Sequence, residues 1–274
     1  MQQAKKQELK KVAANIRVGA LTAVHSAKAG HPGGSLSIAD ILAYLYFEKM
    51  NIDPKNPRME DRDRFVLSKG HTCPGLYSTL AHRGYFPVED LKGFRNIATT
   101  LEGHPDMNKV CGVDMSAGSL GLGISAANGM ALSGKLSGKS YRVYTILGDG
   151  ELEEGQVWEA AMFAAHYKLN NLTAFIDYNG LQIDGDITKV MNPTPIDEKF
   201  RAFNWNVIVI DGHNFDEIEA AVAASEKSDA PTAIIAKCVK GKGVSFMENQ
   251  ASWHGTAPND EQYAAAVAEL QASM

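Results

Sequence analysis

Apolar residues in the first part of the chain recur at the spacing of an α-helix. In residues 8–28 they lie three or four positions apart, at Leu9, Val12, Ile16, Ala20 and Val24. A second apolar stripe covers residues 38–45, and Ser37 followed three positions later by Asp40 resembles a capping box. The pattern predicts two helices, separated by a Gly/Pro-rich loop at residues 29–35.

Further along, short apolar runs alternate with segments of helical spacing. The runs predict strands at 65–68, 142–147, 172–177, 206–210 and 232–238, and the helical segments are 119–136, 153–168, 214–226 and 259–272. Apolar strands separated by helices are typical of a parallel sheet covered on both faces. We therefore expect a three-layer α/β fold with a mostly parallel central sheet. Nothing divides residues 1–274, so we expect one domain that ends in a tail helix at about 259–272.

Composition narrows the class of protein. The chain has 274 residues, of which 45% are hydrophobic and 22% charged, as expected for a soluble globular protein. Its net charge of -5 argues against nucleic acid as a partner, since phosphate binding needs a basic surface. No apolar run approaches membrane-spanning length, no export signal is visible and three scattered cysteines suggest reduced thiols. We expect a cytoplasmic protein.

Two polar motifs follow predicted strands directly. The strand at 142–147 leads into "GDGELEEG", and the strand at 172–177 ends in "DYNG", so Asp149 and Asn179 are 30 residues apart. That spacing is about one strand–helix–strand unit, so both residues would lie at the ligand-binding edge of a parallel sheet. Either motif alone is an ordinary turn signal. Together, with the backbone carbonyl of Leu181, they favour a Mg²⁺–diphosphate site built from oxygen ligands.

A second phosphate-binding feature is predicted at residues 117–131, "AGSLGLGISAANGMA". Gly118 and Ser119 precede a predicted helix, whose free N–H groups would face an anion. Gly121 and Gly123 also fit a dinucleotide fingerprint, which leaves a nicotinamide oxidoreductase as an alternative. However, no clear strand enters the motif, and no acidic residue follows at the usual distance.

Four histidines lie beside glycine or proline, where regular helix or strand is disfavoured. They are His31 in "AGHPGGS", His71 in "KGHTCPG", His104 in "EGHPD" and His254 in "WHG". Zinc is one alternative, but spacings of 40, 33 and 150 residues contain no close ligand pair. The remaining histidines are expected to be structural: His25, His82 and His166 in helical stretches, and His213 in a turn.

Taken in order, these motifs resemble the thiamine-diphosphate-binding domain of transketolases, from about residue 8 to about 260. The motifs are "GHPGG", "LSKGH", "EGHPD", "GSLGLG", "GDGELEEGQVWEA", "DYNGLQIDG" and "SWHG". The Gly-Asp-Gly with a downstream Asn is shared by thiamine diphosphate enzymes generally, whereas the histidine loops narrow the resemblance to transketolases and near relatives.

The resemblance implies a role for each loop histidine. His31, His104 and His254 would line the substrate channel, and His254 would also contact the cofactor; His71 would approach the diphosphate. A neutral imidazole can donate at one nitrogen and accept at the other, and its ordinary pKa near 6.5 permits proton exchange at neutral pH. Proton transfer to and from sugar oxygens needs such groups.

The resemblance also assigns the remaining site residues. Asp149, Asn179 and the Leu181 carbonyl would hold Mg²⁺, for which Ca²⁺ or Mn²⁺ could substitute, and the further cofactor contacts would be Gly118, Leu120, Gly150 and Lys240. Glu154 and Glu159 match interface carboxylates that help to place the activating glutamate and connect paired sites by proton transfer. Read alone, both are ordinary acids near a helix N-terminus.

The implied activity is transfer of a two-carbon ketol unit from a ketose phosphate to an aldose phosphate. In transketolases the activating glutamate and the sugar-phosphate contacts belong to further domains, and the match breaks off before them. We therefore expect a separate C-terminal subunit, in an assembly with two copies of each chain, and pentose phosphates as default substrates. The alternatives are a subunit like 1-deoxyxylulose-5-phosphate synthase, another thiamine diphosphate enzyme subunit, and a non-catalytic cofactor-binding protein.

Overall fold

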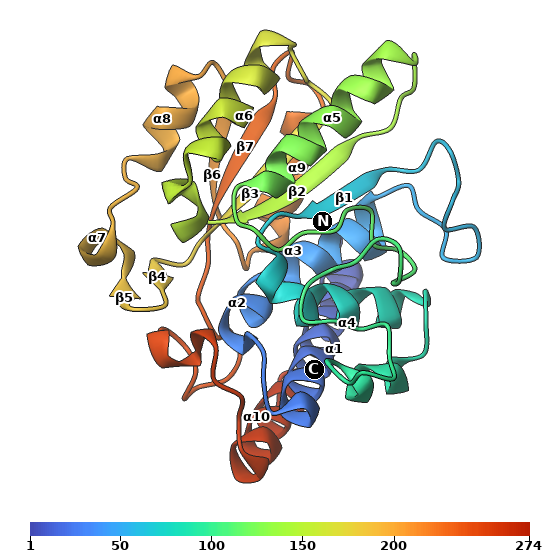
Figure 1. Cartoon of the computed structure of the whole chain (residues 1–274), viewed down its shortest axis with the longest axis vertical. Helices are drawn as coiled ribbons and strands as arrows, with labels where there is room; N and C mark the ends of the chain where they lie inside the picture. Colours follow the sequence, from blue (N-terminus) through green and yellow to red (C-terminus); the bar gives the residue numbers. More distant parts are fainter.

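Five parallel strands form the central sheet of the computed structural model, which describes residues 1–274 (Figure 1). Their order across the sheet is β1-β2-β3-β7-β6, with the bounds β1 Arg64–Leu67, β2 Val143–Gly148, β3 Leu172–Tyr178, β6 Asn206–Asp211 and β7 Thr232–Lys237. Each strand lies within one residue of its predicted bounds. The predicted three-layer α/β fold with a parallel sheet is confirmed.

Helices cover both faces of the sheet, which creates two separate cores. On one face, α5 (Leu122–Leu136), α6 (Gly155–His166) and α8 (Ile196–Ala202) pack in one hydrophobic cluster with the strands. On the other face lie α3 (Ala39–Tyr44) and α9 (Phe215–Ser225), with α1 (Gln3–Ala27) and α4 (Cys73–Arg83) packed against α3. Figure 1 shows α5 and α6 in front of the sheet and α9 behind it.

The strands contribute alternate side chains to the two cores. Ile146 and Phe175 are paired across β2 and β3 and belong to the α3/α9 side, whereas Leu147 and Ile176, the next residues along, belong to the α5/α6 side. All four side chains are fully buried. This two-sided burial explains why the strands read as continuous apolar runs in the sequence.

The chain after β7 returns to the N-terminal helices. Helix α10 (Asp260–Ala272) packs along α1, and its start is closed by a capping box between Asn259 and Gln262. Leu21, Leu36, Trp253 and Leu270 share a third apolar cluster. This packing brings the 3₁₀ turn Ala251–His254 against the short helix α2 (Pro32–Ser37), so two of the loop histidines approach each other.

The segment after the first histidine loop differs from its prediction. Its apolar stripe is buried as expected, but the chain forms α2, α3 and a π-helical turn at Leu45–Lys49 rather than one helix. The capping-box interpretation of Ser37 and Asp40 is wrong. The Ser37 hydroxyl donates to the Gly34 carbonyl at 3.0 Å and to Asp177 at 2.7 Å, while Asp40 pairs with Arg17. Both side chains therefore bond to residues distant in sequence rather than to the backbone at the start of a helix.

Several shorter elements were not predicted. They are the hairpin β4 (Leu181–Gln182) and β5 (Gly185–Asp186), the helices α4, α7 (Ile187–Val190) and α8, and 3₁₀ turns at Gly70–Thr72, Val88–Gly93, Gly150–Glu153 and Ala251–His254. Helix α5 begins at Leu122, three residues later than predicted, because Gly121 adopts a left-handed φ of 82°. No strand enters this turn, contrary to what a dinucleotide fingerprint requires.

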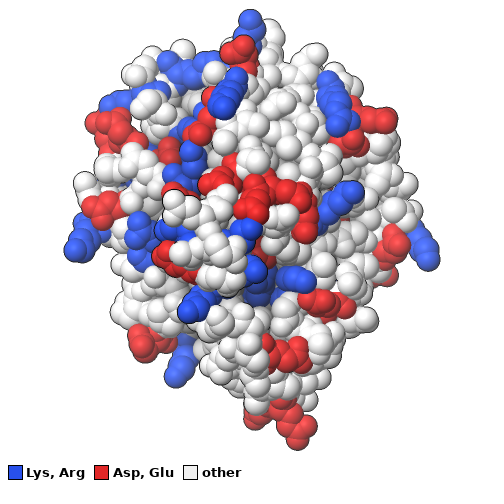
Figure 2. Space-filling model, turned by 180° about the vertical axis from the view of Figure 1, so that it is seen from behind, with Lys and Arg blue, Asp and Glu red and all other residues white.

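The surface carries charges of both signs. Lys and Arg side chains are interspersed with Asp and Glu over the face seen from behind (Figure 2). No helix is both long enough and apolar enough to cross a membrane.

A close approach between α5 and β1 generates a stability prediction. A Cβ at position 123 would lie 2.5 Å from the Cα of Ser68, whereas a Cβ at Gly129 on the same helix meets nothing within 4 Å. Gly123→Ala should therefore lower the free energy of unfolding by about 1–3 kcal/mol through overpacking. Gly129→Ala, the matched control, should raise it by up to about 1 kcal/mol. Chemical denaturation of both variants checks this, and equal shifts would contradict the proposed contact.

Candidate active site

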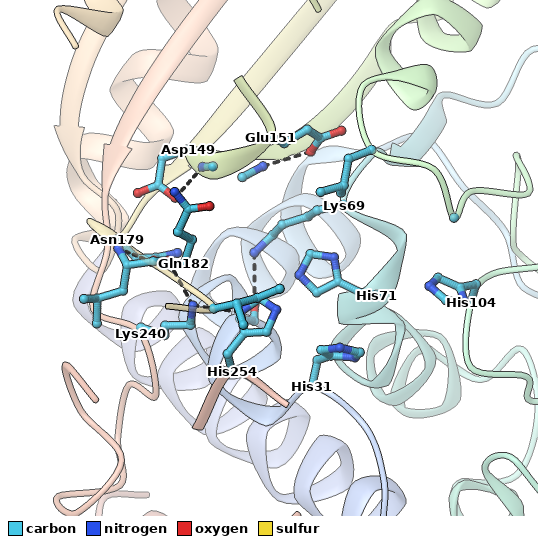
Figure 3. Close-up of a pocket in the computed structure, with 17 residues that line it drawn as sticks. His31, Lys69, His71, His104, Asp149, Glu151, Asn179, Gln182, Lys240 and His254 are labelled. Carbon is cyan, nitrogen blue, oxygen red and sulfur yellow. Dashed lines mark hydrogen bonds between the residues drawn. The ribbon is translucent and has the colours of Figure 1, made fainter. Parts of the chain in front are cut away.

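A cavity of about 420 Å³ opens at the carboxyl ends of the first three strands. It is lined by 17 residues, which include all the site residues predicted from the sequence except Glu154 and Glu159. Figure 3 shows Asp149 and Asn179 on one side of the cavity, His31, His71 and His254 grouped together, and His104 further away. The topology explains this meeting, because parallel strands deliver their ends to the same edge.

A buried ion pair supports the floor of the cavity. The Lys69 ammonium, just past β1, lies 2.5 Å from the Asp177 carboxylate at the end of β3, and both side chains are almost fully buried. The same carboxylate oxygen accepts hydrogen bonds from Ser37 at 2.7 Å and from the Asn179 amide at 3.0 Å. Burial would raise the pKa of Asp177, but the Lys69 charge holds it below its usual value. The pair therefore connects β1, β3 and α2.

Asp149 lies at the end of β2 as a buried carboxylate without an ion-pair partner. Its two oxygens accept backbone N–H groups, one from Gly150 at 2.9 Å and one from Gly180 at 2.6 Å. Burial, and next the Asp177 charge, raise the pKa of Asp149 to about 7. Ionisation of this carboxyl group is unfavourable without a nearby positive charge. A bound cation would supply that charge and lower the pKa of Asp149.

Asn179 and Leu181 bring two further oxygens to the same side of the cavity. The Asn179 amide nitrogen donates to Asp177, which orients its carbonyl oxygen away from that carboxylate; this oxygen accepts the Leu181 N–H at 3.1 Å. The Leu181 carbonyl accepts a hydrogen bond from the Lys240 ammonium at 2.9 Å. One carboxylate, one amide and one backbone carbonyl form an oxygen-only set that could hold Mg²⁺ together with phosphate oxygens.

Lys240 is a second buried cation in the cavity. Only 2% of the residue is exposed, and its Nζ lies 3.0 Å from Nδ1 of His254. Burial, and next the Lys69 charge, lower the pKa of Lys240 to about 8. Together with Lys69, this ammonium group could hold a dianionic ligand such as a diphosphate.

Three of the four loop histidines form a compact cluster. Ring centroids are 5.0 Å apart for His31 and His71, 5.3 Å for His31 and His254, and 5.2 Å for His71 and His254. Burial is the main cause that lowers the pKa to about 4 for His31, about 2 for His71 and about 3 for His254. His31 also has a buried Nδ1 without a hydrogen-bond partner. The imidazoles are therefore neutral at physiological pH.

His104 stands apart from this cluster but lines the same cavity. It faces Gly118, where an added Cβ would lie 3.7 Å from its ring, and burial lowers its pKa less than for the other three. His71 and His254 lie in single 3₁₀ turns rather than in open loops, which is a small correction to the prediction.

The remaining histidines lie outside the cavity. His25, His82 and His166 are in α1, α4 and α6, as predicted, and His25 stacks on Tyr263. His213 lies in the predicted turn, yet both of its ring nitrogens are hydrogen-bonded. No group of three or more His, Cys, Asp or Glu side chains is arranged to hold a metal ion. The pattern expected of a zinc site is thus not present.

Glu154 and Glu159 differ in location from the rest of the predicted set. Both are exposed, Glu154 as the N-cap residue of α6 and Glu159 within that helix, and neither lines the cavity. Glu154 packs beside Gly121, where its Cβ would be 2.9 Å from an added methyl group. The structure therefore leaves them on the surface next to the site.

Sequence reasoning missed several residues of the site, of which Glu151 is the most informative. This buried carboxylate accepts Ser68 Oγ at 2.5 Å, the Gly121 N–H at 2.9 Å and the Gly148 N–H at 3.0 Å, thereby joining β1, β2 and the turn before α5. Lys69, Asp177 and Gln182 were also missed. "GDGE" and "SKGH" contain two of these residues, but a single charged residue in a loop gives no signal of burial.

Comparisons with known proteins agree with this site. Residues 8–272 match the family model described as transketolase, thiamine diphosphate binding domain. The 6-deoxy-6-sulfo-D-fructose transketolase subunit SqwG of Clostridium sp. (strain MSTE9) is 51% identical over 244 residues, with 88% of each chain covered. An apulose-4-phosphate transketolase subunit of Phocaeicola vulgatus is 40% identical, with 90% of this chain and 88% of that protein covered.

Longer transketolases match over a smaller part of their length. The human transketolase is 44% identical over 255 residues, and the match covers 92% of this chain but only 40% of that protein. The crystal structure of the Campylobacter jejuni transketolase superposes with a TM-score of 0.91 at 34% identity, covering 97% of this chain and 43% of that one. With its fold, its cavity and nearly its whole length matched, this chain belongs to the transketolase family, in which it corresponds to the thiamine diphosphate binding domain.

Proposed function

We propose that residues 1–274 form a single domain that serves as the diphosphate-binding subunit of a two-chain transketolase. The observation that carries the proposal is one cavity that combines a set of oxygen ligands, two buried ammonium groups and a cluster of neutral imidazoles. The first could hold Mg²⁺, the second a diphosphate, and the third the hydroxyl and carbonyl groups of a sugar.

Relative lengths support the two-chain assembly. This chain covers 88% of each of two relatives named as subunits, but only 40% of the human transketolase. We infer that a second polypeptide supplies the pyrimidine-binding and C-terminal domains, in an assembly with two copies of each chain.

The cofactor-facing residues would act mainly by position. Thiamine diphosphate supplies an electron sink for breaking a carbon–carbon bond beside a carbonyl. Asp149, Asn179 and the Leu181 carbonyl would hold Mg²⁺, or Ca²⁺ or Mn²⁺ in its place, against the diphosphate. Lys240 and His71 would contact the diphosphate, and the remaining contacts would come from Gly118, Leu120, Gly150 and His254, all of which line the cavity.

The imidazoles of His31, His104 and His254 would bind the sugar oxygens by hydrogen bonds and exchange protons with them. Burial keeps each of them neutral, because it lowers the pKa of each ring, so each can donate from one nitrogen and accept at the other. Ketol transfer requires protons to leave and return to sugar oxygens as a bond next to the carbonyl breaks and re-forms. A channel lined by neutral imidazoles is suited to these proton transfers.

An exposed apolar face beside the site is our candidate for the contact with the second chain. Leu122 is 54% exposed, Met162 60% and Tyr167 46%, all on α5, on α6 or just after α6. Glu154 precedes α6 and packs beside Gly121, the residue after the cavity-lining Leu120, and Glu159 lies within α6. We infer that these carboxylates lie at the interface between the two chains, where they would help place the activating glutamate.

For the substrate, we propose a ketose that carries an anionic group at its far end. The two subunit relatives are named for 6-deoxy-6-sulfo-D-fructose and for apulose-4-phosphate, so both a sulfonate and a phosphate are represented. Pentose phosphates of the pentose phosphate pathway remain the default, and a cytoplasmic location fits them. A subunit like 1-deoxyxylulose-5-phosphate synthase is the second candidate, which the "GHPGG" and "EGHPD" histidines disfavour.

The cation site gives the first functional prediction. Asp149→Ala should lower the affinity for thiamine diphosphate in the presence of Mg²⁺ by about 100-fold or more, because it removes the only carboxylate of the set. Asn179→Ala should cost about tenfold, since a neutral amide contributes less charge stabilisation. Titration calorimetry measures both, with the exposed Asp229→Ala as control. Unchanged affinity in Asp149→Ala would refute the assignment.

The histidines separate into two roles, which is the second prediction. His31→Ala and His104→Ala should lower kcat or raise the donor KM about 100-fold, the scale of general acid–base catalysis, while cofactor affinity stays nearly unchanged. His71→Ala should weaken cofactor binding instead. Steady-state kinetics and calorimetry on the same three variants distinguish these effects. Equal loss of cofactor affinity in all three would show that the division is wrong.

The third prediction concerns the partner. The purified chain alone, at saturating thiamine diphosphate and Mg²⁺, should show no ketol transfer, and adding the product of the adjacent gene should restore it. The reason is that the activating carboxylate and the sugar-phosphate contacts would belong to the second chain. A coupled assay with phosphate- and sulfonate-bearing ketoses measures the rate. Full activity of this chain by itself would overturn the two-chain proposal.

A further inference from the structure

His213 lies outside the cavity, in the turn after β6, and both of its ring nitrogens are bonded. Its Nδ1 lies 2.7 Å from an Asp40 oxygen, and its Nε2 lies 2.9 Å from the backbone nitrogen of Val239. Because a backbone N–H can only donate, Nε2 is the acceptor. The ring proton is therefore on Nδ1, which donates to Asp40, and the neutral tautomer is set by its two partners.

The Asp40 side of this connection is rigid. Asp40 on α3 pairs with Arg17 on α1, and each side chain is only 8% exposed. The Arg17 Nε donates to the Leu36 carbonyl at 3.2 Å, so the same arginine also holds α2. Although burial alone would raise the pKa of Asp40, Arg17 and His213 lower it to about 2, so the carboxylate is ionised. The imidazole is thus tethered to the helical layer.

Val239 connects this histidine to the cavity, because it directly precedes the cavity-lining Lys240. Sheet strand β7 ends at Lys237, and the last cross-strand bond beyond it joins the Cys238 N–H to the Tyr178 carbonyl at 3.0 Å. Val239 is the first residue past that point, and its N–H has the imidazole as its acceptor. The next residue is Lys240, whose Nζ donates to the Leu181 carbonyl inside the cavity.

We propose that His213 is a positioning residue that anchors Val239 and thereby places the Lys240 ammonium in the cofactor cavity. The series of hydrogen bonds Arg17–Asp40–His213–Val239 fixes the loop after β7 relative to helices α1 and α3. That loop has no further backbone hydrogen bonds to the strands of the central sheet. This inference rests on the proposed contact between Lys240 and the diphosphate. It gives a functional reason for a histidine that, from the sequence, is an ordinary turn residue.

The test combines a double-mutant cycle with amide exchange, using the full chain together with its partner chain. His213→Ala should lower the affinity for thiamine diphosphate, with Mg²⁺ present, by about tenfold, the factor that loss of one hydrogen bond represents. Lys240→Met should also lower it, and the double variant should lose no more than Lys240→Met alone. The Val239 amide should exchange faster with deuterium in His213→Ala but not in Lys240→Met.

Two further variants control for general damage. His213→Gln keeps one donor and one acceptor, so it should recover part of the affinity and of the amide protection; it also replaces the alanine variant in the cycle if that variant does not fold. His25→Ala removes another histidine–aspartate hydrogen bond, in which His25 near the end of α1 lies 2.8 Å from Asp260. This variant should behave as wild type.

The possible outcomes test the positioning role of His213 separately from the contact between Lys240 and the diphosphate. Fully additive losses in the cycle, or wild-type affinity with a protected Val239 amide in His213→Ala, would overturn the positioning role. If Lys240→Met binds the cofactor as wild type, the diphosphate contact is wrong. In that case faster Val239 exchange in His213→Ala would still support the anchor, and unchanged exchange would reject it.

Discussion

The buried pair of Lys69 and Asp177 is the interaction on which the site depends. Asp177 is the last residue but one of the central strand β3, and one of its carboxylate oxygens accepts hydrogen bonds from three side chains: Ser37, Lys69 and Asn179. A charge removed from water must be matched closely, since an unpaired partner is strongly destabilising. The ion pair and its hydrogen bonds therefore join α2, the end of β1 and the turn after β3. These three segments meet beneath the cavity and form its floor.

Cation placement shows a similar constraint. Lys69 is neutralised by Asp177, but Lys240 nearby has no carboxylate partner within hydrogen-bond reach and contacts a carbonyl and an imidazole instead. Asp149 has the opposite problem, as a buried carboxylate bonded only to backbone N–H groups. Neither Lys240 nor Asp149 has a side chain of opposite charge within hydrogen-bond reach. A bound cation and a bound anion would satisfy both.

How far the sequence predicts this structure depends on whether a feature is local. Strand bounds and the meeting of Asp149 with Asn179 were predictable, because buried parallel strands give apolar runs and their ends share an edge. The role of Ser37 was not predictable, since its partner Asp177 is 140 residues away. The roles of Glu151 and His213 were missed for the same reason: their burial and partners come from segments distant in sequence.

The imidazole cluster has a consequence for how protons are stored. His31, His71 and His254 have ring centroids no more than 5.3 Å apart, in a region that already holds two lysine ammonium groups. A proton accepted by one ring raises the cost of protonating the other two, so the three rings titrate as one coupled unit. Because burial lowers the pKa of all three rings to about 4 or below, the cluster stores no proton at physiological pH, and a proton that reaches one ring has to pass on before another can follow.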